Sequence, residues 1–372
     1  MKRAYINAAV YGVAVISWLL SAALHNPRMS GNIYSDIVYF WHRDHELRLG
    51  LAPCFEFFFE YPPLSCVVTY LSRIIGGPVL ESYYSAFVYL SLPAYLLLTW
   101  SIITIVEKSG VSKLGLLVIA SPSLVVYGIY NYDHFAAAFA GAAIALFLLG
   151  RRELSALSSG LALAFKLYSG LILPLFLIEL KDTRQRLTYF AYFVIGAAVP
   201  YVAQIILNPH SIVEFFRYHG GWGLENAWYI WIFGNPGSPS AKIFGLAIAA
   251  YLLLRVYVMR GSLQAKCLLA VAAWLFSSYV FTPQMVIWLI PLIAAQPRAL
   301  YFWPAVEITN VGIIMTWFGD YDPIMPGTPP QVLALIRAVS LGLMGLSVYY
   351  GERGVSPKEL VLRFIGREHR LA

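Results

Sequence analysis

Apolar segments close to the length of a membrane-spanning helix, about 20 residues, recur along the whole chain. No other feature restricts the fold as much, because a segment in lipid must satisfy its backbone hydrogen bonds internally. Charged residues make up only 12% of the 372 positions, against about 25% in soluble domains. The sequence therefore predicts an all-α, polytopic membrane protein that forms a single integral-membrane domain over residues 1–372. We expect the first apolar run to be a retained helix rather than a cleaved signal peptide.

Lysine and arginine gather in the short connections between the apolar segments. If these connections and both termini are cytoplasmic, one consistent path through the membrane results, as the positive-inside rule requires. The net charge of +7 is then explained by topology, so we expect no nucleic-acid partner. Most histidines and several acids fall on the opposite side, which predicts a cell-membrane protein whose working surface faces outside. The basic connections are residues 107–113, 151–152, 181–186 and 260–266, and Arg298.

This path predicts ordinary spans and one shorter hairpin, about 12 transmembrane segments in all. Two large extracytoplasmic loops are expected, residues 26–81 and residues 208–239, and residues 351–372 are predicted to form a cytoplasmic amphipathic tail. The ordinary spans are residues 5–25, 82–106, 113–129, 134–150, 186–207, 240–259, 264–281, 284–296, 299–318 and 330–350.

Residues 61–76 are apolar, but a span there would invert the basic connections that follow. We therefore expect a helix that lies on the outer leaflet within the first loop, with an ordinary short span as the alternative. Cys54, Cys66 and Cys267 show no metal-ligand spacing. A disulfide between the first two is an open alternative if both lie outside.

Residues 155–180 are bounded by basic residues at both ends. A chain this short cannot cross the bilayer twice as full helices, so two half-length helices are implied, with a turn at residues 166–170. Lys166 then lies near the start of a short helix, where free amides and the helix dipole attract anions, and this combination suits a phosphate. The alternative is a lysine that reaches a lipid headgroup or forms a structural pair.

Asp36 closely follows the first apolar run and is flanked by Tyr34 and Tyr39. A partly desolvated carboxylate in this place could accept a proton, although a single acid in a loop is ordinarily just solvated. Asp133 begins another helix, where Asp is common for capping alone. In the late helices, Glu307 and Arg337 are expected to face the bundle or each other.

Six short stretches in this order resemble the GT-C superfamily of polyprenyl-phosphate-sugar-dependent glycosyltransferases. The resemblance is strongest to the archaeal and bacterial mannosyltransferases and to the catalytic subunit of GPI mannosyltransferase I, and it covers most of the chain. The stretches are YSDIVYFW (34–41), FEYPPLS (59–65), NYDHFAAAF (131–139), LAFKLYSGLILP (163–174), LENAWYIWIFG (224–234) and FTPQMVIWLIP (281–291).

The resemblance implies that Asp36 is the catalytic base of an inverting transfer at the extracytoplasmic face. Lys166, Arg217 and His219 are then predicted to hold the donor phosphate. The residues predicted to bind substrate are Tyr34, Asp133, Tyr168, Glu225, Asn226 and Gln284. The first motif has one acid where the GPI enzyme has two, because Val38 follows Ile37. Hard cations prefer several oxygen ligands, so we expect metal-independent transfer and no cofactor.

The expected partners are a polyprenyl (dolichyl) phosphate sugar donor, a lipid or glycan acceptor, membrane lipids and a small membrane subunit. Mannose is favoured only by the resemblance. Two other functions stay open. A lipid or solute transporter or flippase would be favoured by internal inverted repeats and paired charges at mid-membrane. A non-catalytic subunit of a glycosylation complex would assemble normally but transfer no sugar after purification.

Overall fold

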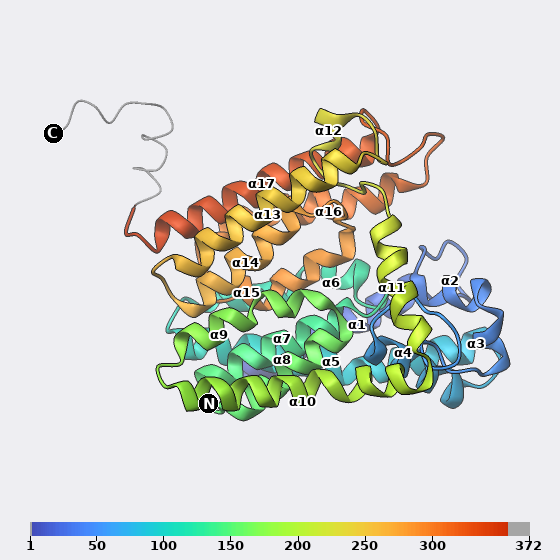
Figure 1. Cartoon of the computed structure of the whole chain (residues 1–372), viewed down its shortest axis with the longest axis horizontal. Coiled ribbons are helices and arrows are strands. Elements are labelled where there is room, and N and C mark those ends of the chain that lie inside the picture. The colour runs from blue at the N-terminus through green and yellow to red at the C-terminus, as the bar shows by residue number, and fades with distance from the viewer. Residues whose placement is uncertain (1, 356–372) are drawn as a thin grey trace. The chain divides into compact units, whose positions relative to one another are not determined.

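The computed structural model describes residues 2–355, and these residues form an all-α protein (Figure 1). Within this part of the chain there are no named strands, only two isolated bridges, Pro53 with Phe57 and Glu225 with Val280. The all-α prediction is therefore confirmed. The amphipathic tail predicted at residues 351–372 lies almost wholly outside the described residues.

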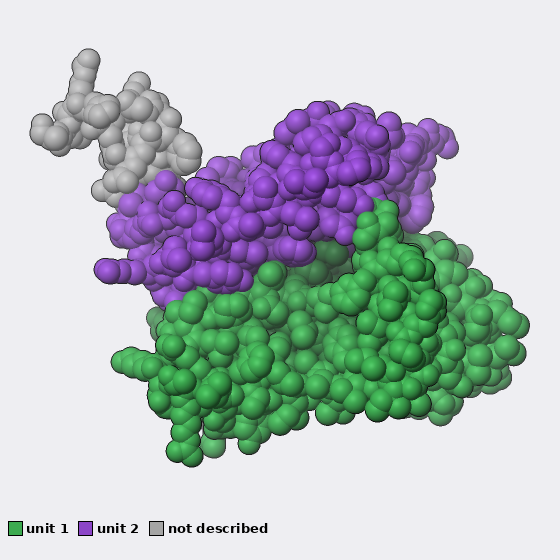
Figure 2. Space-filling view, viewed as in Figure 1, with its two compact units in different colours: residues 1–222, 283–294 green, residues 223–282, 295–372 purple. Residues whose placement is uncertain are grey.

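The chain divides into two compact units (Figure 2). Unit 1 comprises residues 1–222 and 283–294, and unit 2 comprises residues 223–282 and 295–372. Both units are discontinuous in sequence, because residues 283–294 return to unit 1. The assignment of all 372 residues to one membrane domain stays a prediction.

The described part of unit 1 contains α1 (Lys2–Leu24), α2 (Asp36–Arg43), α3 (His45–Leu49), α4 (Pro63–Gly76), α5 (Leu80–Ser109), η1 (Lys113–Ala120), α6 (Pro122–Tyr127), α7 (Asp133–Leu148), α8 (Arg152–Phe165), η2 (Leu167–Leu171), α9 (Leu173–Glu179), α10 (Thr183–Leu207), α11 (Pro209–Gly221), η3 (Pro283–Leu289) and α15 (Ile290–Ile293). The described part of unit 2 contains α12 (Ile230–Phe233), α13 (Pro239–Val258), α14 (Leu263–Ser277), η4 (Ala299–Tyr301), α16 (Trp303–Trp317) and α17 (Pro329–Gly351). The η elements are 3₁₀ helices.

Five helices of the described chain are long and apolar enough to cross a membrane: α1, α5, α10, α13 and α17. Six further apolar segments are shorter. The segment at 113–129 is not the continuous helix that we predicted. It consists of η1 and α6, which meet at Ser121. Pro122 disfavours the helical conformation at the residue before it, which explains the break. The number of about 12 spans stays a prediction.

The first loop is helical, as predicted, and α4 corresponds to the helix expected at 61–76. Pro63 occupies the first helical position, where its fixed φ is favourable and its missing amide hydrogen costs nothing. Gly77 ends the helix with a positive φ of 74°, which glycine adopts without strain. One face of α4 packs against α5 and α8. The position of α4 relative to the membrane stays a prediction.

The break predicted within 155–180 is present at Lys166. The helix α8 ends at Phe165, and Lys166 is extended, with φ −155° and ψ 135°. The chain then turns back through η2, where the Ser169 hydroxyl donates to the carbonyl of Ser159 at 3.2 Å. The helices α8 and α10 lie side by side (Figure 1). The hairpin therefore places Lys166 at the point where the backbone changes direction.

Unit 2 has its own buried core. Leu224, Ala227, Tyr229 and Ile230 pack with α13. The buried Arg337 of α17 donates to Asn310 at 2.6 Å and to the carbonyl of Phe281 at 2.5 Å. Its guanidinium also lies 3.6 Å from the centre of the Phe281 ring. The predicted inward orientation of Arg337 is confirmed, and Glu307 is likewise buried. A structural pair between the two, the default expectation, stays a prediction.

Candidate active site

Asp36 is the first residue of α2, and the local sequence explains why the helix begins there. The Ser35 side chain caps the helix by accepting from the amide of Val38 at 3.3 Å. A carboxylate in the first turn is favoured by the helix dipole. The amide of Asp36 itself donates to the carbonyl of Tyr130 at 3.0 Å. The start of α2 is thus tied to the segment that precedes α7.

The side chains of Tyr61 and Asn131 hold the Asp36 carboxylate. The Tyr61 hydroxyl donates to Oδ2 at 2.7 Å, and the Asn131 amide donates to the same oxygen at 3.2 Å. Asn131 also lies 3.3 Å from the Tyr61 hydroxyl. Three segments that are far apart in sequence therefore meet at one carboxylate, which is only 9% exposed.

The environment of Asp36 favours its protonated form more than water does. Burial raises the pKa of the carboxyl from its ordinary value to about 6. The hydrogen bond from Tyr61 lowers the pKa, the negative charge of Glu60 raises it, and Asn131 and the positive charge of Lys166 lower it. A group with a pKa just below neutrality is mostly ionised at pH 7 and still a competent base. The pKa of Asp36 therefore suits a group that accepts a proton from a substrate.

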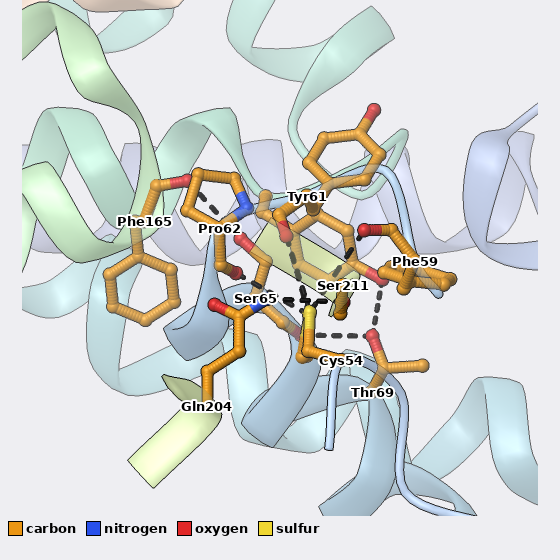
Figure 3. The surroundings of a disulfide bond; sticks show 11 residues. Cys54, Phe59, Tyr61, Pro62, Ser65, Thr69, Phe165, Gln204 and Ser211 are labelled. Atoms are coloured by element: carbon orange, nitrogen blue, oxygen red, sulfur yellow. Dashed lines mark hydrogen bonds between the residues drawn. A yellow bond between two sulfur atoms is a disulfide. The ribbon is translucent and has the colours of Figure 1, made fainter. Parts of the chain in front are cut away.

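Tyr61 is positioned by the loop that precedes α4 (Figure 3). Cys54 and Cys66 form a disulfide, so the bridge left open by the sequence is present. Their sulfur atoms lie 3.3 and 3.4 Å from the carbonyl oxygen of Tyr61. Figure 3 shows Tyr61 and Pro62 next to Cys54 of this disulfide. The main chain at Tyr61 is thus packed against a covalent cross-link.

Lys166 lies next to the same tyrosine. Its ammonium is 4.4 Å from the centre of the Tyr61 ring and 3.3 Å from Oδ2 of Asp133. The Lys166 side chain is 13% exposed and that of Asp133 is fully buried. The other oxygen of Asp133 accepts from the indole of Trp288 at 2.5 Å. Asp133 therefore holds the ammonium in place and is itself held by Trp288.

The predicted residues of the hairpin and of η3 lie beside this pair. Tyr168 stacks on Trp288 with ring centres 4.1 Å apart and an angle of 6° between the planes. Both rings are buried, and so is Gln284 in η3. The roles of Tyr168, Asp133 and Gln284 toward a substrate stay predictions.

Tyr34 is the predicted site residue closest in sequence to Asp36. Its ring lies 5.6 Å from that of Tyr130 and 5.8 Å from that of Tyr39, measured between centres. Burial, followed by the charge of Asp36, raises the pKa of Tyr34 well above its usual range. Tyr34 therefore lies within the electrostatic field of the candidate base.

The helix α11 carries His219 and Arg217, which face different surroundings. His219 hydrogen-bonds the carbonyl of Phe215 at 2.8 Å, and burial, with a smaller contribution from the positive charge of Lys166, lowers its pKa. His219 is thus within electrostatic range of Lys166. Arg217 is 70% exposed and donates to Glu214 at 2.5 Å. Its predicted contact with a donor phosphate stays a prediction.

Glu225 and Asn226 belong to unit 2. The amide of Glu225 donates to Tyr279 at 2.8 Å, and the carbonyl of Glu225 accepts from Phe281 at 2.9 Å. Asn226 has a positive φ of 54°, a conformation that Asn tolerates better than most residues. Its side-chain oxygen accepts from Gln331 at 3.2 Å. Both residues are rigidly held within their own unit, and their substrate contacts stay predictions.

Three residues that contribute to this site were not selected from the sequence: Tyr61, Asn131 and Trp288. Each lies within a stretch that drew attention for other reasons, but their pairings with Asp36 and Asp133 span 25, 95 and 155 positions. Only the folded chain brings them together. Among the described residues, no three His, Cys, Asp or Glu side chains gather as metal ligands would, and metal-independent transfer stays a prediction.

Comparison with known proteins gives a resemblance in structure alone. No protein-family model matches the sequence, and no curated protein matches it. A crystal structure of ArnT from Cupriavidus metallidurans bound to undecaprenyl phosphate is 14% identical, with a TM-score of 0.44 over 93% of this chain and 77% of that chain. The apo structure of the same protein is 14% identical, with a TM-score of 0.47 over 95% and 78%.

Proposed function

We propose that the chain is an inverting glycosyltransferase of the GT-C type that moves a sugar from a polyprenyl phosphate to a lipid-linked or glycan acceptor. Mannose is the sugar that the sequence resemblance favours, and the proposed face is the extracytoplasmic one. The observation that carries the proposal is that a buried carboxylate of raised pKa, Asp36, and a sequestered ammonium, Lys166, both contact Tyr61.

The two groups match the two charges that change in such a transfer. The acceptor hydroxyl loses its proton to Asp36 as its oxygen forms a bond to the anomeric carbon. The bond from that carbon to the phosphate oxygen breaks at the same time, and its electron pair leaves with the polyprenyl phosphate. One displacement inverts the configuration at the anomeric carbon. The reaction needs no redox partner and no covalent intermediate on the protein.

Lys166 stabilises the negative charge that accumulates on the departing phosphate. A preorganised cation in a poorly solvated place is effective in this role, because it needs no reorganisation as the charge develops. Asp133 orients the ammonium through their ion pair and acts through Lys166. Burial of the Lys166 and Asp133 pair prevents water from screening the lysine charge fully.

The acceptor lies beside Asp36, and Tyr34, whose pKa is raised by burial and by the charge of that carboxylate, is an aromatic residue that could contact its sugar. The polyprenyl tail of the donor occupies the membrane, which explains why an enzyme for a small sugar has such an apolar chain. His219 supports Lys166 when it is protonated, and its lowered pKa makes that contribution small at neutral pH.

The test is transfer of radiolabelled mannose from polyprenyl-phosphate mannose to a membrane lipid extract by the purified chain, with Asp36→Asn as the variant. Wild type should form a labelled lipid and the variant should lose activity by about 10²- to 10⁴-fold, the usual contribution of a general base. The reaction is run with and without a chelator, which should have no effect. Equal product from wild type and Asp36→Asn would remove Asp36 from the mechanism.

The matched control is Glu56→Gln, which changes an acid of the same loop that contacts the backbone amide of Ala52. This variant should keep wild-type transfer. A parallel assay with polyprenyl phosphates that carry other sugars identifies the donor. Failure with mannose and success with another sugar would correct the sugar and leave the assignment of Asp36 intact.

A further inference from the structure

The disulfide lies beside the candidate base through one residue. Cys54 and Cys66 are both fully buried, and their Cα atoms are 5.9 Å apart. Both sulfur atoms contact the carbonyl oxygen of Tyr61, at 3.3 and 3.4 Å. The hydroxyl of the same tyrosine donates to Oδ2 of Asp36 at 2.7 Å. The cross-link and the carboxylate thus meet opposite ends of one residue, its main chain and its hydroxyl.

The loop between the two cysteines would not hold this shape by secondary structure alone. Between Cys54 and the start of α4 at Pro63, its secondary structure is limited to the isolated bridge of Phe57 with Pro53. Cys54 adopts a φ of 66°, which is uncommon for a residue other than glycine. A disulfide across 12 positions removes much of the freedom that the loop has when the chain is unfolded. We therefore expect the disulfide to stabilise the conformation of the loop between Cys54 and Cys66.

The helix that carries Cys66 also reaches the Lys166 turn. In α4 the Ser65 hydroxyl donates to the carbonyl of Phe165 at 3.2 Å, and Phe165 directly precedes Lys166. One turn later, Thr69 lies 2.5 Å from the hydroxyl of Tyr132, which directly precedes Asp133. Figure 3 shows Ser65, Thr69 and Phe165 around the disulfide. The helix α4, which the disulfide anchors, thus contacts the residues that directly precede Lys166 and Asp133.

We propose that the Cys54–Cys66 disulfide is a positioning element for the active site, which fixes Tyr61 so that its hydroxyl holds Asp36 ready for reaction. The inference rests on the proposed role of Asp36 and deepens it. Tyr61 is a positioning residue in the same sense, because it acts on the carboxylate and not on the substrate. The disulfide is fully buried, so its contribution is made when the chain folds.

Several charged or titratable groups face Asp36, and their effects have known signs. Tyr61 and Lys166 lower the pKa of Asp36, and Glu60 raises it, while the charge of Asp36 in turn raises the pKa of Tyr34. Loss of the Tyr61 hydrogen bond must therefore raise the pKa of Asp36 further. The acidic limb of any activity that needs ionised Asp36 then moves to higher pH.

The experiment compares four purified variants: Cys54→Ala/Cys66→Ala, Tyr61→Phe, the combination of both, and Cys267→Ala as the control. Cys267 is a buried cysteine outside the disulfide. The first readout is the pH dependence of sugar transfer. The second is carbodiimide labelling of Asp36, followed by peptide mass spectrometry across the same pH range, which needs no substrate and no activity.

We expect the disulfide variant and Tyr61→Phe to move both curves upward by about one pH unit, the size expected when a hydrogen bond to a charged group is lost. The combined variant should move them no further than Tyr61→Phe alone, because both changes remove the same interaction. Cys267→Ala should leave both curves unchanged. Additive shifts, or an unshifted labelling curve in the disulfide variant, would overturn the proposal.

A second disulfide variant distinguishes a loss of positioning from misfolding caused by the substitution itself. Cys54→Gly/Cys66→Ala removes the disulfide but places glycine where φ is positive, which costs no steric strain. If this variant folds and labels Asp36 at wild-type pH, the disulfide does not position the base. The labelling curve also separates two kinds of failure. A shifted curve in a chain without transferase activity would support the positioning role and contradict the proposed function.

Discussion

At the scale of single residues, three side chains in contact form the candidate site: Asp36, Tyr61 and Lys166. Asp36 accepts from the Tyr61 hydroxyl and Lys166 lies over the ring of that tyrosine. From the sequence, Asp36 was predicted as the base mainly through the resemblance to the GT-C superfamily. Lys166 was predicted from its place at a helix break, where a charged side chain costs free energy in lipid unless it is used. Sequence reasoning could not select Tyr61 or Asn131 as their partners, because contacts between distant positions have no local pattern in one sequence.

The Lys166 and Asp133 pair gives a prediction about stability. Lys166→Met should destabilise the folded protein by about 3 kcal/mol, because it leaves the Asp133 carboxylate buried without a counter-charge. Lys166→Met/Asp133→Asn should recover most of that loss, since an amide costs less to bury than a carboxylate. Thermal unfolding in detergent measures both.

The double variant Lys166→Met/Asp133→Asn should recover stability but not sugar transfer. The double variant lacks the cation proposed to face the phosphate, so its transfer should stay at least about 10²-fold below wild type. The exposed Lys181 provides the control, and Lys181→Met should change neither quantity. Recovery of transfer in the double variant would show that Lys166 only neutralises Asp133.

At the scale of elements, the break at Lys166 was predictable and the break at Ser121 was missed. The first followed from an apolar segment too short to cross the membrane twice between basic ends. The second has a local signal, Pro122, which the apolar character of residues 113–129 outweighed in our prediction. Apolar composition shows that a segment is buried or in lipid, but it does not show that the helix is continuous.

The contact between α8 and α10 gives a prediction at this scale. A side chain at Gly160 would meet the carbonyl of Phe193, and one at Gly196 would meet the carbonyl of Leu157. Small residues let two helix backbones approach this closely. Gly160→Val should therefore destabilise the protein by about 1–3 kcal/mol, the usual cost of overpacking, and should also lower transfer, because α8 ends next to Lys166.

Gly12 supplies the matched comparison in α1. A Cβ there would meet nothing within 4 Å, so Gly12→Ala should be neutral or should stabilise the helix by about 0.5–1 kcal/mol. Thermal unfolding of the two variants is the measurement. Equal destabilisation by Gly160→Val and Gly12→Ala would mean that the close approach of α8 and α10 does not contribute to stability in particular.

At the scale of the whole molecule, the all-α class followed from composition and from the repeated apolar segments, whereas the division into two units did not. Residues 283–294 return to unit 1, and nothing in their composition distinguishes them from the neighbouring segments of unit 2. The five helices long enough to span a bilayer support membrane insertion. The orientation of the chain rests on the distribution of Lys and Arg.

Orientation can be tested with single cysteines at exposed positions in a Cys267→Ala background, where Cys54 and Cys66 stay paired. A membrane-impermeant maleimide should label Ser30→Cys, in the first loop, from outside intact cells. It should label Lys181→Cys, in the connection before α10, only after the membrane is made permeable. The reverse pattern would place Asp36 on the cytoplasmic side and contradict the positive-inside assignment.

The central claim is that Asp36 is the base of the transfer, and the measurement that tests it most directly is kcat/KM for sugar transfer as a function of pH. This quantity reports the pKa values of the free enzyme. Burial raises the pKa of Asp36 to about 6, so activity should fall tenfold per pH unit as the pH drops below about 6 and the carboxylate becomes protonated. Asp36→Asn should lose both the activity and this limb. A residual activity in Asp36→Asn that keeps the same limb would show that another group accepts the proton.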